Sequence, residues 1–99
     1  MIKFRGVKVE LDDGTEIVVP AFGYLDAFDS EERIEAEPNI RKRFEIMVEK
    51  LVPLIQRNHP EIDAERLSKE SAASIGDLWR AGMRFKNEGT VSGESGRRP

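Results

Sequence analysis

The sequence contains no cysteine and a single histidine. Disulfides, thiolate nucleophiles and cysteine metal sites are therefore excluded, and the absence of cysteine also suits the reducing cytosol. The histidine, His59, lies between Asn58 and Pro60 and has no companion residue at the spacing of a metal or catalytic site. We therefore interpret His59 as a surface turn residue.

Long apolar runs and motifs that carry chemistry are also missing. No apolar stretch approaches the roughly 20 residues that cross a bilayer, and residues 1–6 contain no apolar run of signal-peptide length. The serines form no Gly-x-Ser-x-Gly elbow, and no glycine-rich loop is placed to cradle a phosphate. Asp12 and Asp13 lack EF-hand spacing. We expect no enzymatic activity, no catalytic residue, no metal, no cofactor and no membrane span.

Charge is unevenly distributed along the chain, although the net charge is only −3. Residues 21–37 carry six acidic side chains against one arginine, whereas residues 38–58 carry five basic side chains against two glutamates. We interpret the two segments as complementing each other on a solvated surface. The alternative is a nucleic-acid-binding patch, formed by Arg41, Lys42, Arg43 and Arg57. The net negative charge argues against that alternative.

The composition predicts one small domain. The 99 residues are 38% hydrophobic and 35% charged, which is polar for a globular chain but too apolar for disorder throughout. We predict a single domain over residues 1–86, with a hairpin at 2–20 and a helical region at 21–86, followed by a flexible tail at 87–99. The core of such a domain is modest, so its stability is marginal or supplemented by a partner.

Two alternating patterns predict the hairpin. Residues 7–11 and 15–19 both alternate between apolar and polar side chains, which is the period of a half-buried strand. The Asp-Gly step that ends at Gly14 supplies the positive φ of a tight turn. Gly6 permits a bulge, and Pro20 ends the second strand because proline cannot donate to a ladder.

The strongest helical signal covers residues 39–57. Its apolar spacing predicts a core-facing stripe composed of Ile40, Phe44, Met47, Val48, Leu51, Leu54 and Ile55. Pro38 suits the first turn of this helix. Pro53 lacks a backbone donor, so we expect it to kink or interrupt the helix.

The other helical segments are less regular. Residues 21–37 predict a short helix or aromatic loop, and then an acidic turn or short helix that Ser30 caps. Asp63 predicts the N-cap of a helix that begins at Ala64. Serines make the following stretch a weak helix former, so we expect the last helix over about residues 75–86. A hairpin followed by a bundle of three to four short helices is an α+β fold.

Large apolar side chains are the candidate functional feature. Seven of them are candidate partner-binding residues: Phe22, Tyr24, Leu25, Phe28, Trp79, Met83 and Phe85. Aromatic and methionine side chains suit an exposed groove or stripe that takes the apolar segment of a partner. The same side chains can instead fill the small core, and both interpretations stand at this point.

Two segments of the sequence resemble a known family. Residues 4–21, Phe-Arg-Gly-Val-Lys-Val-Glu-Leu-Asp-Asp-Gly-Thr-Glu-Ile-Val-Val-Pro-Ala, resemble the start of the small tail assembly chaperones of long-tailed bacteriophages and prophages. Residues 54–67 resemble the family's Arg-Asn-Tyr-Pro-like step and the capped helix after it, with His59 in the aromatic position. Residues 75–85 match the final helix of the family in placement.

The resemblance implies a non-catalytic protein-binding factor in the cytoplasm of a bacterial host. Tail assembly chaperones bind the long, helical tape measure protein and shield its apolar faces before the tail tube closes around it. The implied partners are therefore the tape measure protein, the tail tube protein and further copies of this chain as a homo-oligomer. Two other functions also fit the sequence, namely an oligomeric structural component of a phage and a small nucleic-acid-binding regulator.

Overall fold

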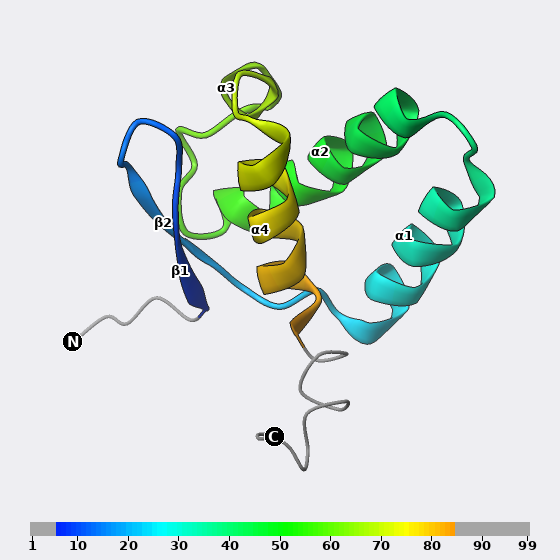
Figure 1. Cartoon of the computed structure of the whole chain (residues 1–99). Coiled ribbons are helices and arrows are strands. Elements are labelled where there is room, and N and C mark those ends of the chain that lie inside the picture. The colour runs from blue at the N-terminus through cyan, green and yellow to red at the C-terminus, as the bar shows by residue number, and fades with distance from the viewer. Residues whose placement is uncertain (1–5, 85–99) are drawn as a thin grey trace, which may run out of the picture.

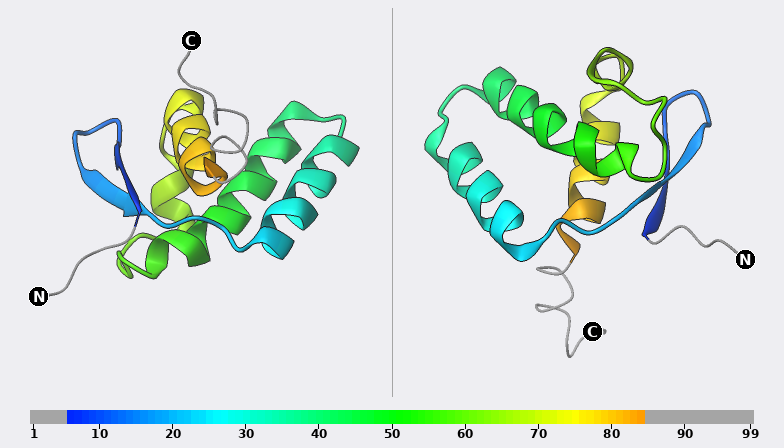
Figure 2. Two further views of the ribbon diagram at one scale, coloured as in Figure 1. Left: turned by 90° about the horizontal axis from the view of Figure 1, so that it is seen from below. Right: turned by 180° about the vertical axis from the view of Figure 1, so that it is seen from behind.

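A hairpin and four helices make up the part of the chain that the computed structural model describes, residues 6–84. The elements are β1 (Val7–Glu10), β2 (Glu16–Val19), α1 (Tyr24–Ala36), α2 (Ile40–Gln56), α3 (Ala64–Ser68) and α4 (Ala72–Gly82). This order confirms the predicted α+β class. The hairpin and α1 lie at opposite ends of the molecule, with α2 and α4 between them (Figures 1 and 2). The tail predicted at 87–99 lies outside the described residues.

The hairpin forms where the alternating pattern predicts it. β1 and β2 are antiparallel, with Val9 opposite Ile17. The carbonyl of Leu11 accepts from Gly14 N at 2.9 Å across the turn, and Gly14 has the expected positive φ, 90°. β2 ends directly before Pro20, as predicted.

The loop after α2 covers the outer edge of β2. Val18 N donates to His59 Nε2 at 2.9 Å, and Asn58 Nδ2 donates to Val18 O at 2.9 Å. The His59 side chain is only 16% exposed. These bonds satisfy backbone groups that the second strand of a two-stranded hairpin would otherwise present to solvent. The interpretation of His59 as a surface turn residue is therefore wrong, since its ring holds the hairpin against α2.

The core lies where the hairpin, α2, α3 and α4 meet. Its fully buried large side chains come from all of these elements: Ile17, Val19, Leu51, Ile55, Leu67 and Leu78. The sheet contributes one face to this core, and Lys8 and Glu10 on the other face are exposed. This arrangement is the ordinary one for a half-buried antiparallel pair.

α2 follows its predicted bounds to within one residue, but Pro38 lies outside the helix and Pro53 does not interrupt it. Asn39 caps the helix by accepting from Lys42 N at 3.1 Å, so Pro38 precedes the cap and does not occupy the first turn. The helix continues through Pro53 without interruption. Pro53 is exposed, so water can satisfy the carbonyl that its missing N–H leaves open.

The apolar stripe of α2 is buried only towards its C-terminal end. Leu51 is completely buried, whereas Phe44 and Val48 are partly buried and pack against the edge of the core. Ile40 is 64% exposed, which corrects its assignment to the core-facing stripe. Part of the apolar surface on the N-terminal half of α2 is therefore left uncovered by the other described residues.

One helix, α1, replaces the two short elements predicted between residues 21 and 37. Ser30 lies in the middle of α1 and is fully buried, so its prediction as an N-cap is wrong. α1 packs against α2, and the other buried position of α1 is Ala27. Arg33 Nη1 pairs with Glu49 Oε2 at 2.9 Å across the two helices. In this pair the basic residue comes from the acidic segment and the acidic residue comes from the basic segment, which is the opposite of the expected contact.

Replacing Ser30 with alanine should stabilise the protein. The Ser30 Oγ is buried and has no hydrogen-bond partner among the described residues. A buried unsatisfied hydroxyl costs free energy, and serine is also a weaker helix former than alanine. We expect Ser30→Ala to raise the free energy of unfolding by about 1 kcal/mol in a urea titration followed by circular dichroism.

The same substitution at Ser74 is the matched control for Ser30. Ser74 is also buried, but its Oγ donates to Asp12 Oδ1 at 2.6 Å. Ser74→Ala should therefore destabilise the protein. Equal effects at the two serines would show that the hydrogen bonding of the hydroxyl does not determine the sign.

α4 spans Ala72–Gly82 and so begins earlier than the predicted helix at 75–86. Its N-cap is Ser71, whose side chain accepts from Ser74 N at 3.2 Å. The serines that we interpreted as weak helix formers thus supply the start of the helix, because a serine hydroxyl replaces the missing backbone acceptor. Asp63 caps α3 as predicted.

Candidate functional site

Some of the predicted partner-binding residues pack in the interior. Phe22 and Met83 are buried, and the ring centroids of Phe22 and Trp79 lie 5.2 Å apart. Gly82 makes room for this packing, since a Cβ there would lie 2.8 Å from Cε2 of Phe22. The structure therefore places Phe22 and Met83 in the core, with Trp79 at its edge. Phe85 lies outside the described residues.

The other three predicted residues lie on the surface of α1. Tyr24, Leu25 and Phe28 are 66%, 63% and 51% exposed. Their spacing within the first two turns of the helix places them on one side, away from the buried Ala27 and Ser30. Large apolar side chains grouped in this way on a small domain are the kind of surface that a protein partner covers.

A second apolar surface is a groove between α2, α3 and α4, with a volume of about 790 Å³. The apolar part of its lining consists of Phe44, Val48, Ala64, Leu67, Ala72 and Ile75. The polar part consists of Arg41, Glu45, Glu65, Ser68 and Glu70. This volume lies within the range of pockets that accept small ligands or inserted side chains.

The charged residues that line the groove pair with residues four positions away in the sequence. Arg41 Nε lies 3.6 Å from Glu45 Oε2, and Lys69 Nζ lies 3.9 Å from Glu65 Oε2. Both pairs have the i, i+4 spacing of solvated helix pairs. Because these charges are balanced locally, the groove is suited to apolar side chains more than to a charged ligand.

The groove was not predicted from the sequence. Phe44 and Val48 were assigned to a stripe that faces the core, whereas the structure leaves both of them partly exposed along the groove. The feature of the sequence that could have indicated the groove is the width of the apolar stripe on α2. α3 has only 5 residues, which is too few to cover the N-terminal half of α2.

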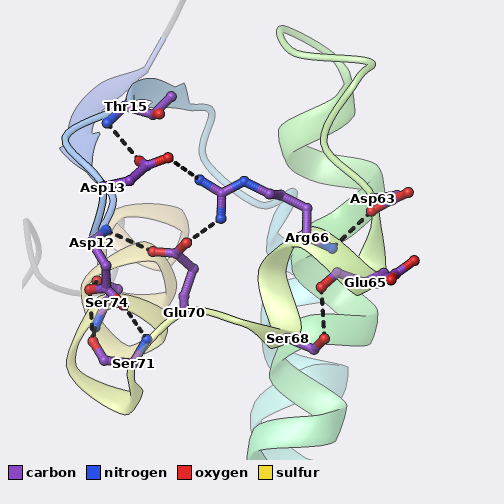
Figure 3. Close-up of polar contacts among 10 residues, drawn as sticks. All are labelled: Asp12, Asp13, Thr15, Asp63, Glu65, Arg66, Ser68, Glu70, Ser71 and Ser74. Carbon is purple, nitrogen blue, oxygen red and sulfur yellow. Dashed lines mark hydrogen bonds and ion pairs between the residues drawn. The ribbon is translucent and has the colours of Figure 1, made fainter.

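Asp12, in the hairpin turn, holds the start of α4 that forms one wall of the groove (Figure 3). Its carboxylate accepts from Ser71 N at 2.6 Å, from Ser71 Oγ at 2.9 Å and from Ser74 Oγ at 2.6 Å. Its backbone N–H donates to Glu70 Oε1 at 2.8 Å. Hydrogen bonds from Ser74 and Ser71 hold the pKa of Asp12 below its ordinary value.

Arg66 extends this polar cluster to α3. It pairs with Glu70, whose side chain is only 3% exposed, and its Nη2 lies 3.1 Å from Asp13 Oδ2. Asp13 also accepts from Thr15 N at 2.9 Å, and hydrogen bonding from Thr15 holds its pKa below the ordinary value. The carboxylates are occupied by contacts within the protein. The cluster therefore positions the hairpin turn and the α3–α4 junction and does not resemble a pair of catalytic acids.

The basic residues considered for nucleic-acid binding are not assembled into one patch. Arg41 pairs with Glu45, and Arg43 Nε donates to Glu37 O. Arg57 follows the other end of α2, so it lies about 24 Å along the helix axis from Arg41. The structure therefore gives this set no common surface.

Residues 6–84 contain no cluster of three or more histidine, aspartate or glutamate side chains placed to hold a metal ion. In the same part of the chain, no helix combines the length and the apolar character needed to span a membrane. Comparison of the chain with protein-family models, curated proteins and solved structures found no match.

Proposed function

We propose that this chain is a non-catalytic protein-binding factor whose groove takes apolar side chains from a helical segment of a partner. The observation that carries this proposal is the groove itself, about 790 Å³ in volume, with an apolar lining and locally paired charges. Helix-in-groove recognition uses the same combination of apolar anchors and polar edges. Covering Phe44 and Val48 in this way would remove their apolar surface from water.

The finer proposal is that the chain is a phage tail assembly chaperone whose client is a tape measure protein. Its support is the resemblance of residues 4–21 and 54–67 to that family. A tape measure protein is a long helix with apolar faces, so successive apolar residues can enter the groove. In this proposal the chain acts in the cytoplasm of a bacterial host, recruits tail tube subunits and releases its client when the tube closes. A structural phage component would instead form oligomers that persist when the client is present.

Replacing Ala72 with glutamate tests the groove. Ala72 is exposed at the first position of α4 and lines the groove, so the new carboxylate would stand where apolar side chains are proposed to bind. Acidic residues are tolerated in the first turn of a helix, so the fold should persist. We expect Ala72→Glu to reduce the tape measure protein recovered in a co-expression pull-down by roughly tenfold.

Ala73→Glu is the matched control for the groove test. Ala73 is the next residue of α4, is exposed and does not line the groove, so it introduces the same charge in the same turn. We expect this variant to retain the client at the level of the unmodified chain. Equal recovery with both variants would overturn groove binding, and failure of the unmodified chain to keep any client soluble would overturn the chaperone proposal.

A further inference from the structure

We propose that the outer face of α1 is a second docking site, separate from the groove, for a basic amphipathic helix of a partner protein. This α1 face consists of Tyr24, Leu25, Phe28, Glu32 and Glu35. The first three are exposed apolar residues, and the two glutamates are also exposed. The α1 face shares no residue with the groove, so either proposal can fail without the other.

The α1 face has an apolar half and an acidic half. Glu32 follows Phe28 by four residues and Glu35 follows it by seven, so both lie along the same side of the helix. A partner helix that lies along α1 therefore meets apolar side chains near the N-terminus of α1 and carboxylates near its C-terminus. The matching partner has apolar residues at one end of its contact face and lysine or arginine at the other.

The charge on this face is not neutralised from within α1. The one basic residue of the helix, Arg33, is paired with Glu49 of α2 at 2.9 Å, and this contact raises the pKa of Arg33 and lowers that of Glu49. Glu32 and Glu35 therefore present negative charge beside the apolar residues. Charges placed at the rim of an apolar patch give specificity and steer a partner of opposite sign.

A second copy of this chain is a poorer occupant of the α1 face. Parallel pairing of two α1 helices would place Glu32 and Glu35 of one copy beside the same glutamates of the other, and like charges disfavour such contacts. Antiparallel pairing would place these carboxylates against the apolar half of the other copy, where they lose hydration without gaining a partner. Three exposed apolar side chains also offer less area than the roughly 1,200–2,000 Å² buried in a stable interface. A basic helix supplies the missing attraction through its charges.

Fluorescence anisotropy with two synthetic peptides tests the proposal on the full chain. One peptide is an amphipathic helix with leucine at one end of its contact face and lysine at the other, and its counterpart replaces each lysine with glutamate. We expect only the lysine peptide to bind, with an affinity that falls as salt is added. Leu25→Gln should weaken binding roughly tenfold, and the double variant Glu32→Gln/Glu35→Gln roughly fivefold.

The control for charge is the double variant Glu10→Gln/Glu16→Gln. These glutamates face each other on the hairpin, at the opposite end of the molecule, and their replacement changes the net charge by the same amount (Figure 1). We expect it to leave the affinity within about twofold of the unmodified chain, because its charges lie far from α1. Equal weakening by the two double variants would overturn the proposal in favour of non-specific attraction to an acidic protein.

Two further outcomes would also overturn the proposal. Loss of peptide binding in Ala72→Glu would place the peptide in the groove. Dimers that sedimentation detects without peptide, and that Leu25→Gln abolishes, would make a second copy the occupant of the α1 face. If the peptide tests fail while Ala72→Glu still loses the client, groove binding stands and only the α1 site is rejected.

Discussion

Replacing Gly6 with alanine lowers the free energy of unfolding by about 3 kcal/mol, a large fraction of the stability of a small domain. Gly6 precedes β1 and has φ of +145°, where residues with a side chain are strained. A Cβ there would lie 2.2 Å from the Val19 carbonyl oxygen and 2.9 Å from Pro20 N. These are backbone atoms of the paired strand, so the clash is relieved only by moving β1 away from β2. Urea titration followed by circular dichroism measures the loss.

Two other glycines separate steric clash from backbone strain. Gly14 has φ of +90°, but a Cβ there would meet only Glu10 Oε2, at the ordinary contact distance of 3.7 Å, so Gly14→Ala should cost about 1 kcal/mol from conformation alone. Gly23 has φ of −62° and nothing within 4 Å of a Cβ, so Gly23→Ala should stay within about 0.5 kcal/mol of the unmodified protein. A Gly6→Ala variant no less stable than Gly14→Ala would show that β1 does not approach β2 as described.

The elements predicted correctly are those that short stretches of sequence specify. The turn before Thr15 forms because an Asp-Gly step supplies the required backbone conformation, and Asp63 caps α3 because its carboxylate reaches a nearby N–H. In both cases the interacting groups are within three residues of each other. Neither interaction depends on how the helices pack.

The errors at Ser30 and Ser71 have a tertiary cause. Acidic residues directly after Ser30 favoured it as a cap, whereas Ser71 was counted among the serines that weaken a helix. In the structure Ser30 is buried in α1, whereas Ser71 caps α4 and receives a partner from 59 residues away, Asp12. The residues near Ser71 in the sequence give no indication that Asp12 will bind it. The start of α4 was therefore placed too late.

The candidate site was predicted in part. Residue type identified Tyr24 and Leu25 as apolar surface candidates, but it gave Phe22 the same status although its ring is buried against α4. Which of these side chains points outwards depends on the side of α1 that meets α2. The groove exists because α3 is too short to cover Phe44 on α2, which stays partly exposed. Periodicity in one helix does not report the length of its neighbour.

Replacing Asp12 with asparagine lowers the midpoint of thermal unfolding at neutral pH by roughly 10 °C. The asparagine oxygen can still accept from the Ser74 hydroxyl, but its amide group cannot accept from the backbone N–H of Ser71. The hairpin turn then loses a contact that holds the N-terminus of α4. Because that turn of α4 forms part of the groove, Asp12→Asn should also reduce client recovery.

The effect of this substitution depends on pH with a definite sign. Hydrogen bonds from Ser74 and Ser71 lower the pKa of Asp12 in the folded state, so its carboxylate stabilises the fold above the ordinary carboxyl pKa of about 3.9. That contribution is lost as the pH falls through the lowered folded-state pKa. The melting midpoints of Asp12→Asn and the unmodified chain should therefore differ most near neutral pH and converge under acid conditions.

Asp29→Asn is the control for this prediction, because it removes a carboxylate exposed on α1 and should follow the unmodified chain across the pH range. A constant difference between Asp12→Asn and the unmodified chain at every pH would mean that the charge of Asp12 does not hold the hairpin turn to α4.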